Sequence, residues 1–131
     1  VKQQFESFVN GWDSTLRALD VPFCVRVDPN AELDFVLEFG GHKASPGQAS
    51  GGQICCLSLG FVLTAYKMLC SEVGFLILDE PTYGLDADHL DRIIEVLSEL
   101  NAYANNTGLQ VIVISHEEVI RNAFPQVIEL S

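Results

Sequence analysis

The sequence predicts an α/β fold in which a mostly parallel sheet is flanked by helices. Two uninterrupted apolar strands, at residues 75–78 and 111–114, are separated by an amphipathic helix over 88–104. Continuous apolar strands linked by helices are typical of a parallel sheet that is covered on both faces. The length of 131 residues predicts one domain, and the composition of 48% hydrophobic and 19% charged residues excludes intrinsic disorder.

Residues 1–20 are predicted to form a helix like those that leave a coiled coil. The apolar residues follow one another at spacings of four, three, four and three, namely Phe5, Val9, Trp12, Leu16 and Leu19. These spacings are those of a coiled-coil seam, although they extend over only about two heptads. A short amphipathic helix packed on its own domain explains them equally well. Pro22 ends the pattern.

Residues 21–131 are predicted to form one lobe, which begins with a short β-hairpin. Alternating apolar residues predict strands over 23–27 and 33–39, joined by a turn at Asp28-Pro29-Asn30. The following segment, 40–53, is rich in Gly, Ser and Pro, and it is predicted to be a loop.

An almost entirely apolar helix is predicted from Ile54 to about Cys70. Its 17 residues are at the lower limit for crossing a membrane, and polar residues interrupt the run. A buried core helix is therefore the better interpretation, and no membrane partner is predicted. After the second apolar strand, the pattern predicts a short helix over 117–124 and a last strand over 126–130.

Charge and cysteine content narrow the class of function. The 7 basic residues against 18 acidic ones give a net charge of −11. Such an acidic surface repels phosphate backbones, which argues against non-specific nucleic-acid binding by this chain alone. The four cysteines include no C-x-x-C pair, so they are predicted to be reduced core thiols of a cytoplasmic protein. The opening residues lack the pattern of a signal peptide.

Two carboxylates follow the first apolar strand directly. In a parallel α/β sheet, ligands bind beyond the carboxyl ends of the strands, which is where Asp79 and Glu80 are expected. An apolar strand that ends in Asp is the Walker B arrangement, in which the Asp holds Mg²⁺, usually through water. Glu80 is then placed to polarise an attacking water. On their own, the two carboxylates are equally well explained as an acidic helix-capping turn.

Two further motifs occur in matching positions. The apolar helix opens with Ala49, Ser50, Gly51, Gly52 and Gln53. Free N–H groups and the positive end of the helix dipole suit a phosphate there, although such a segment alone is more often a flexible loop. His116 follows the second apolar strand, and it reaches the same crevice as Asp79 if the two strands are neighbours. A lone histidine in this place is otherwise a surface residue.

The order of these motifs resembles that of the C-terminal half of an ABC-type ATPase, from Gln48 to His116. The resemblance implies that residues 49–53 are the signature motif, with Ala where Leu is usual. It also implies that Asp79 is the Walker B aspartate, Glu80 the catalytic glutamate and His116 the switch histidine. The D-loop that it implies consists of Gly84, Leu85 and Asp86.

A helix and a hairpin before the signature resemble the C-terminal lobe of the SMC, SbcC and RecF group of DNA-repair and chromosome ATPases. Pro81-Thr82 after Glu80 is most like the SbcC-type nuclease-partner ATPases. The resemblance implies that two heads sandwich ATP with Mg²⁺, and that the signature of one head completes the site of the other.

No G-x-x-x-x-G-K-[ST] motif is present in the sequence, so the nucleotide must be held by another lobe. The partners implied are a Walker A-containing N-terminal lobe, a second head in a homodimer, a nuclease subunit, and DNA through the complete complex. The implied location is the cytoplasm, with the nucleoid, or the nucleus in a eukaryotic host.

Two alternative functions are the nucleotide-binding half of an ABC transporter and a non-catalytic dimerisation module. The hairpin argues against the transporter, in which a helical subdomain precedes the signature. The presence together of Asp79, Glu80 and His116 argues against a module that has lost its chemistry.

Overall fold

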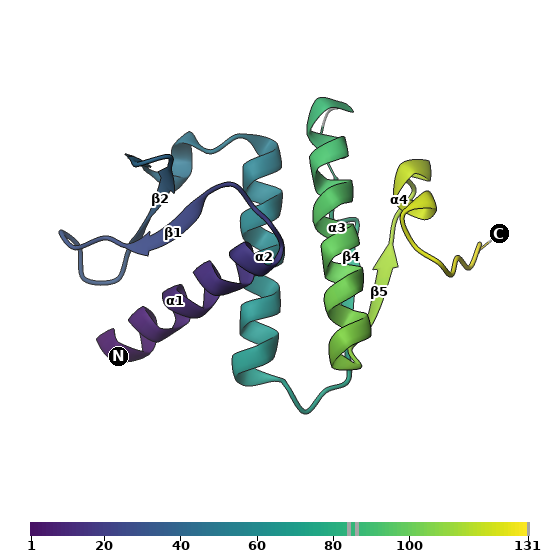
Figure 1. Cartoon of the computed structure of the whole chain (residues 1–131), viewed down its shortest axis with the longest axis horizontal. Coiled ribbons are helices and arrows are strands. Elements are labelled where there is room, and N and C mark those ends of the chain that lie inside the picture. The colour runs from purple at the N-terminus through teal and green to yellow at the C-terminus, as the bar shows by residue number, and fades with distance from the viewer. Residues whose placement is uncertain (84, 86, 131) are drawn as a thin grey trace.

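The computed structural model describes residues 1–83, 85 and 87–130, with the side chains of Asp88, His89 and Arg92 not included. Two long helices, α2 and α3, stand side by side, with α1 and a hairpin on one side and a two-stranded sheet and α4 on the other (Figure 1). In chain order the elements are α1 (Lys2–Ala18), β1 (Cys24–Val27), β2 (Phe35–Phe39), β3 (His42–Ala44), the 3₁₀ helix η1 (Pro46–Gln48), α2 (Gly51–Leu69), β4 (Phe75–Asp79), α3 (Ala87–Thr107), β5 (Gln110–Ile114) and α4 (Glu118–Asn122).

The predicted opening helix is confirmed, and its apolar seam is buried within this chain. Val9, Trp12 and Leu16 are each no more than 6% exposed and belong to the main core. Over these residues α1 is therefore an amphipathic helix packed on its own domain. It ends where Asp20 adopts a left-handed φ of 56° and the N–H of Val21 donates to the carbonyl of Leu16.

Helix α1 is joined to α2 by close packing and by side-chain hydrogen bonds. The indole Nε1 of Trp12 donates to the backbone carbonyl of Leu57 at 3.0 Å, and this bond is buried. A Cβ added to Gly60 would lie 2.5 Å from Leu16 Cδ2, so any larger residue here would force the side chain of Leu16 to move. The two helices therefore form one packed unit.

Asp13 joins α1 to the hairpin. Its carboxylate accepts from Arg17 at 2.6 Å and from the backbone N–H of Val25 at 3.1 Å, and it pairs with Arg26 at 2.7 Å. The Asp13 residue itself is only 4% exposed. A buried carboxylate is tolerated here because three donors offset its loss of water.

The hairpin is confirmed, but the prediction of a loop over 40–53 is partly wrong. Strand β1 pairs antiparallel with β2, and β2 pairs with the additional strand β3 before η1 begins. Gly40 and Gly41 have positive φ values of 52° and 88° and form the two-residue turn between β2 and β3. Two consecutive positive φ values match the right-handed twist of antiparallel strands. This turn was not predicted because the residues after it are rich in Gly, Ser and Pro, as in a loop.

Helix α2 begins at Gly51, three residues before the predicted start at Ile54, because Ser50 caps it. It packs between α1 and α3. By length and composition it is apolar enough to cross a membrane, and 39% of its most apolar window is buried in the structure. Two sides are covered, and the remaining side exposes Ile54, Phe61, Val62, Met68 and Leu69.

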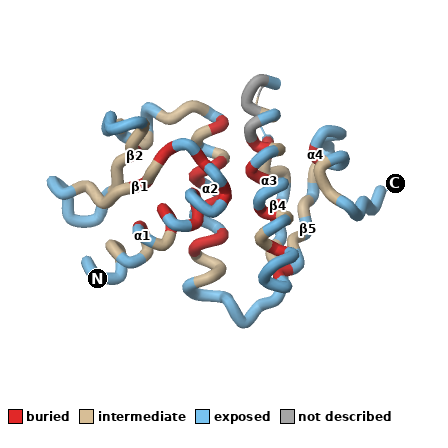
Figure 2. The backbone as a smooth tube through the Cα atoms, viewed as in Figure 1, coloured by how far each residue is buried: buried red, intermediate tan, exposed pale blue. Residues whose placement is uncertain are grey.

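The predicted parallel sheet is confirmed for β4 and β5, whose register places Leu78 beside Val113 and Asp79 beside Ile114. The prediction that both of its faces are covered is wrong for the described residues. One face packs on the core, with Leu78 8% exposed. Four apolar residues of the other face remain 41–52% exposed, and they are Phe75, Ile77, Ile112 and Ile114. In Figure 2, parts of β4 and β5 are accordingly coloured as exposed. We call these four side chains the open sheet face.

Two smaller predictions are wrong. Residues 126–130 form no strand, because no described neighbour pairs with them, and Arg121 of α4 instead binds Glu129 at 2.7 Å. The four cysteines are free thiols as expected, but only Cys56 lies in the core. Cys24 and Cys55 are half-buried and Cys70 is exposed, since it lies beyond the last turn of α2.

Candidate functional site

The carboxylates of the predicted Walker B segment lie at the carboxyl edge of the β4–β5 sheet. Asp79 is the last residue of β4, and its side chain is exposed. Glu80 continues the ladder by one bond, in which its N–H donates to the carbonyl of Ile114 at 2.7 Å. Its φ of 47° is left-handed, a conformation that costs about 1–2 kcal/mol for a residue with a side chain.

His116 and Glu80 meet at this edge, as the sequence predicted for neighbouring strands. His116 Nε2 lies 3.4 Å from Glu80 Oε1. The imidazole is 97% exposed, whereas the carboxylate side chain is 28% exposed. Glu80 Oε1 is itself buried and has no hydrogen-bond partner among the described residues, because the contact with His116 lacks hydrogen-bond geometry. A buried carboxylate oxygen without a donor is costly, and it is suited to receiving one from a ligand.

A tight turn carries the chain away from Glu80. The N–H of Tyr83 donates to the carbonyl of Glu80 at 3.1 Å, and the N–H of Leu85 donates to that of Thr82 at 3.1 Å. Thr82 is only 2% exposed, and its hydroxyl has no hydrogen-bond partner among the described residues. This turn leads into the predicted D-loop, of which Gly84 and Asp86 lie outside the described residues.

The signature segment begins α2 with a capping box. Ser50 Oγ accepts from the N–H of Gln53 at 3.3 Å, and Gln53 Oε1 accepts from the N–H of Ser50 at 2.9 Å. Both side chains are therefore engaged in starting the helix, a role that the S-x-x-Q spacing signals and that the sequence interpretation missed. The first N–H groups of a helix have no partners within it, which is the property that a phosphate site uses.

The signature segment also touches the carboxylate turn of the same chain. The thiol of Cys55 donates to the carbonyl of Pro81 with a distance of 3.5 Å from Sγ to O. A Cβ added to Gly51 would lie 3.4 Å from Leu85 Cδ2. The remaining signature residues line the same helix start, with Gly52 buried and Ala49 half-buried against the core. No sequence pattern pointed to the hydrogen bond between Cys55 and Pro81.

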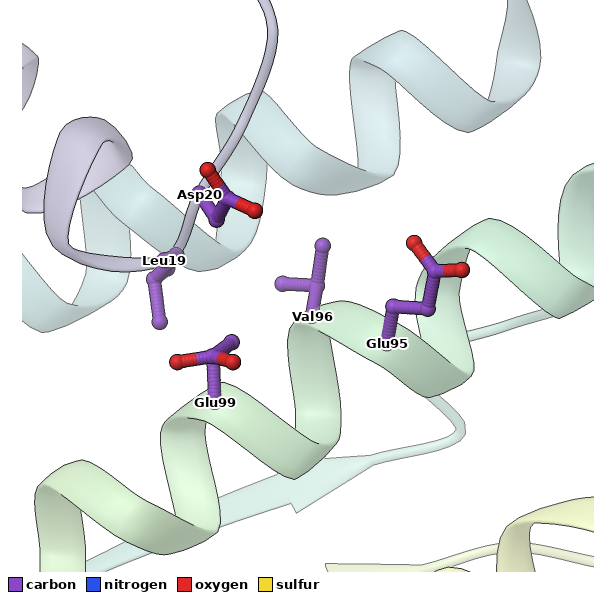
Figure 3. A pocket seen from close by; sticks show the side chains of 5 residues that line it. All are labelled: Leu19, Asp20, Glu95, Val96 and Glu99. Carbon is purple, nitrogen blue, oxygen red and sulfur yellow. The ribbon is translucent and has the colours of Figure 1, made fainter.

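A separate acidic cleft of about 170 Å³ lies between the end of α1 and the middle of α3. In Figure 3, Glu95 and Glu99 of α3 lie on either side of Val96, opposite Leu19 and Asp20. Three carboxylates repel a phosphate, and none of the predicted site residues lines this cleft. The candidate site is therefore the sheet edge and the start of α2.

Comparison with known proteins supports a relationship over most of the chain. The family model described as "AAA domain, putative AbiEii toxin, Type IV TA system" matches residues 3–122. The protein named DNA double-strand break repair Rad50 ATPase of Thermococcus kodakarensis is 36% identical over 93 residues, or 71% of this chain. Its namesake from Sulfurisphaera tokodaii is 33% identical over 132 residues, or 99% of this chain. The chain spans only 10% and 14% of the length of these two relatives.

The fold has solved counterparts as well. A structure from the study titled "Structural biochemistry of ATP-driven dimerization and DNA stimulated activation of SMC ATPases" superimposes with a TM-score of 0.73 and 20% identity. The match covers 98% of this chain and 79% of the other. The SMC head domain from Thermotoga maritima superimposes with a TM-score of 0.64 and 20% identity, over 95% of this chain and 45% of the other. The chain therefore belongs to the AAA domain family whose model it matches, and its fold is that of a lobe of an SMC-type ATPase head.

Proposed function

We propose that this chain is the C-terminal half of an ATP-hydrolysing head in a DNA-repair or chromosome-maintenance ATPase. The relatives at 36% and 33% identity carry the name Rad50 ATPase, which supports an ATPase of this kind. The observation that carries the proposal is the approach of Glu80 Oε1 and His116 Nε2 to 3.4 Å at the carboxyl edge of two parallel strands. Ligands of parallel α/β sheets bind at this edge.

The residues at the edge fit a Mg²⁺–ATP substrate. Among the described residues, no group of three or more His, Cys, Asp or Glu side chains could chelate a metal alone. Asp79, whose side chain is exposed, would hold Mg²⁺ through water while the nucleotide supplies phosphate oxygens. The ion would neutralise charge on the phosphates. Glu80, which has an oxygen without a donor, would accept a hydrogen bond from the attacking water, and His116 would donate to the γ-phosphate.

The signature segment serves the nucleotide of a second head. Its backbone N–H groups at Gly51 and Gly52, with the hydroxyl of Ser50, would contact the γ-phosphate held by that head. Ser50 Oγ accepts from the N–H of Gln53, and its hydroxyl proton would donate to a phosphate oxygen. ATP would then close two heads, and hydrolysis would release them.

A Walker A-containing lobe is the partner that the open sheet face would bind. This face consists of Phe75, Ile77, Ile112 and Ile114, all of them 41–52% exposed. A contiguous exposed apolar face of this kind marks an interaction surface. DNA would be bound through the complete complex, in the cytoplasm or nucleoid, with basic residues supplied by other parts because this chain carries a net charge of −11. A nuclease subunit would be a further partner.

The substitution Glu80→Gln in the complete ATPase tests the proposal. The amide keeps the shape of the side chain but cannot take a proton from water, so turnover should fall about 10²–10⁴-fold. ATP binding should persist, and closed head dimers should accumulate. Single-turnover hydrolysis, nucleotide affinity and size-exclusion chromatography with light scattering measure these three quantities.

Glu72→Gln is the matched control, because Glu72 is an exposed glutamate before β4, at the opposite end of that strand. It should hydrolyse ATP like the wild type. Near-normal hydrolysis by Glu80→Gln would show that another residue acts as the base. The 131-residue chain alone should neither bind Mg²⁺–ATP tightly nor hydrolyse it, and steady turnover by it would contradict the division of the site between lobes.

A further inference from the structure

The backbone of Glu80 depends on its surroundings. Its left-handed φ of 47° is unfavourable for a residue with a side chain, and such a conformation persists only where neighbours hold it. Its N–H donates to Ile114 and its carbonyl accepts from Tyr83, at 2.7 and 3.1 Å. The first bond joins the turn to β5, and the second closes the turn internally. Neither bond joins the turn to α2, the helix that the signature segment begins.

Cys55 provides that connection. Its thiol donates to the carbonyl of Pro81, the residue directly after Glu80, and the two are 26 positions apart in the chain. Cys55 is half-buried, at the start of the second turn of α2. Burial raises the pKa of the Cys55 thiol, so the sulfur keeps the proton that it donates at neutral pH.

The same helix also approaches the turn at a second residue, Leu85. Leu85 lies against Gly51, where a Cβ would be 3.4 Å from Leu85 Cδ2. The first turns of α2 thus contact the chain both at Pro81 and at Leu85. The peptide bond between Glu80 and Pro81 is planar, and the ring of Pro81 fixes its φ, so the carbonyl carbon of Pro81 is linked rigidly to the backbone of Glu80. A displacement of that carbon therefore shifts the backbone of Glu80 and the direction of its carboxylate.

We propose that Cys55 is a positioning residue for Glu80, because its thiol holds the Pro81 carbonyl and so keeps the Glu80 carboxylate directed at the attacking water. This inference rests on the proposed function and adds a connection to it. The start of α2 would present its N–H groups to the nucleotide of the other head and, through Cys55, support hydrolysis in its own head.

Three substitutions in the complete ATPase separate this role from packing. Cys55→Val is apolar and slightly larger but has no donor, and Cys55→Ser keeps a donor. Cys70→Val changes an exposed thiol at the far end of the same helix and serves as a control. A single neutral hydrogen bond contributes modestly, so the kcat of Cys55→Val should fall about three- to tenfold. The KM for ATP, ATP-dependent head engagement and Tm should stay close to wild type. Cys55→Ser should recover at least half of the kcat, and Cys70→Val should match wild type.

Two results would overturn the proposal. If Cys55→Val keeps full kcat, the thiol does not position Glu80. If kcat, head engagement and Tm all fall together and serine restores none of them, Cys55 only fills space in the core. A wild-type complete ATPase that binds but does not hydrolyse ATP contradicts the proposed function itself, whereas wild-type turnover with an unaffected valine variant contradicts only the role of Cys55.

Discussion

The two halves of this chain differ in whether their buried polar side chains have hydrogen-bond partners. In the helical half, which comprises α1, the hairpin and α2, buried polar side chains have partners. Asp13 has three, Trp12 donates to Leu57, and the hydroxyl of Thr64 lies 3.0 Å from that of Thr15. In the sheet half, which comprises β4, α3, β5 and α4, Glu80 Oε1 and Thr82 Oγ1 are buried without partners among the described residues.

The two faces of the sheet also differ in how far their apolar side chains are buried. Leu78 of β4 is 8% exposed, while its neighbour Ile77 on the opposite face is 52% exposed. Successive side chains of a strand point to opposite faces of the sheet, so β4 is buried on one face and exposed on the other. In the helical half, α2 also exposes apolar side chains, but the buried polar side chains have partners. The sheet half combines exposed apolar side chains with buried polar atoms that lack a partner among the described residues, and the proposed lobe and nucleotide would complete both.

The largest expected difference is between alanine substitutions at Leu78 and Ile77. Leu78→Ala should lower the free energy of unfolding by about 2–5 kcal/mol, because it removes packed methyl groups from the core. Ile77→Ala should lower it by less than about 1 kcal/mol, since half of that side chain is already in water. Urea unfolding of the chain measures both. In a mixture with the Walker A lobe, Ile77→Ala should weaken binding of that lobe. If the two variants lower the free energy of unfolding of the chain alone by the same amount, the open sheet face is not exposed in solution.

A second expected effect concerns Asp13, which joins elements within the helical half. Asp13→Ala should destabilise the chain by about 2–3 kcal/mol, because Val25 loses the acceptor of a buried N–H. The side chains of Arg17 and Arg26 are 64% and 39% exposed. Water can therefore hydrate both guanidinium groups after Asp13 is removed, which limits the loss of stability. Asp13→Asn keeps an acceptor and should cost about half as much. Thermal unfolding in low and high salt tests this, and a neutral alanine variant would show that the carboxylate does not hold α1 to β1.

Elements with a strong local pattern could be predicted from the sequence. The period of α1 and the continuous apolar runs of β4 and β5 specify their own structures, and two parallel strands bring His116 to Glu80. Because no Walker A motif is present, some apolar surface was expected to await another lobe, but the sequence did not show that one face of the sheet would be left open. A continuous apolar run has the same sequence whether this chain or another lobe covers it. Residues 126–130 have the composition of a strand, but strand structure depends on a neighbour.

Contacts that depend on tertiary approach carried no sequence signal. The close packing of Leu16 on Gly60 and the hydrogen bond from Cys55 to Pro81 join segments that are far apart in the chain. The turn at Gly40-Gly41 did have a signal, two adjacent glycines between alternating residues, and it was concealed by the loop-like composition around it. Local rules therefore located the site, while its internal connections came only from packing.

The smallest expected effect has a sign opposite to the others. Thr82 is 2% exposed and its hydroxyl has no partner among the described residues, so the native chain bears the cost of removing that group from water. Thr82→Val has nearly the same shape and no hydroxyl, and it should stabilise the chain by about 1 kcal/mol.

Thr15→Val is the matched control from the helical half. Its hydroxyl donates to the carbonyl of Gly11 at 3.0 Å, so the same substitution should destabilise there. Urea unfolding of both variants gives the two signs. If Thr82→Val destabilises the chain as Thr15→Val does, the hydroxyl of Thr82 is satisfied, and the two halves do not differ in this respect.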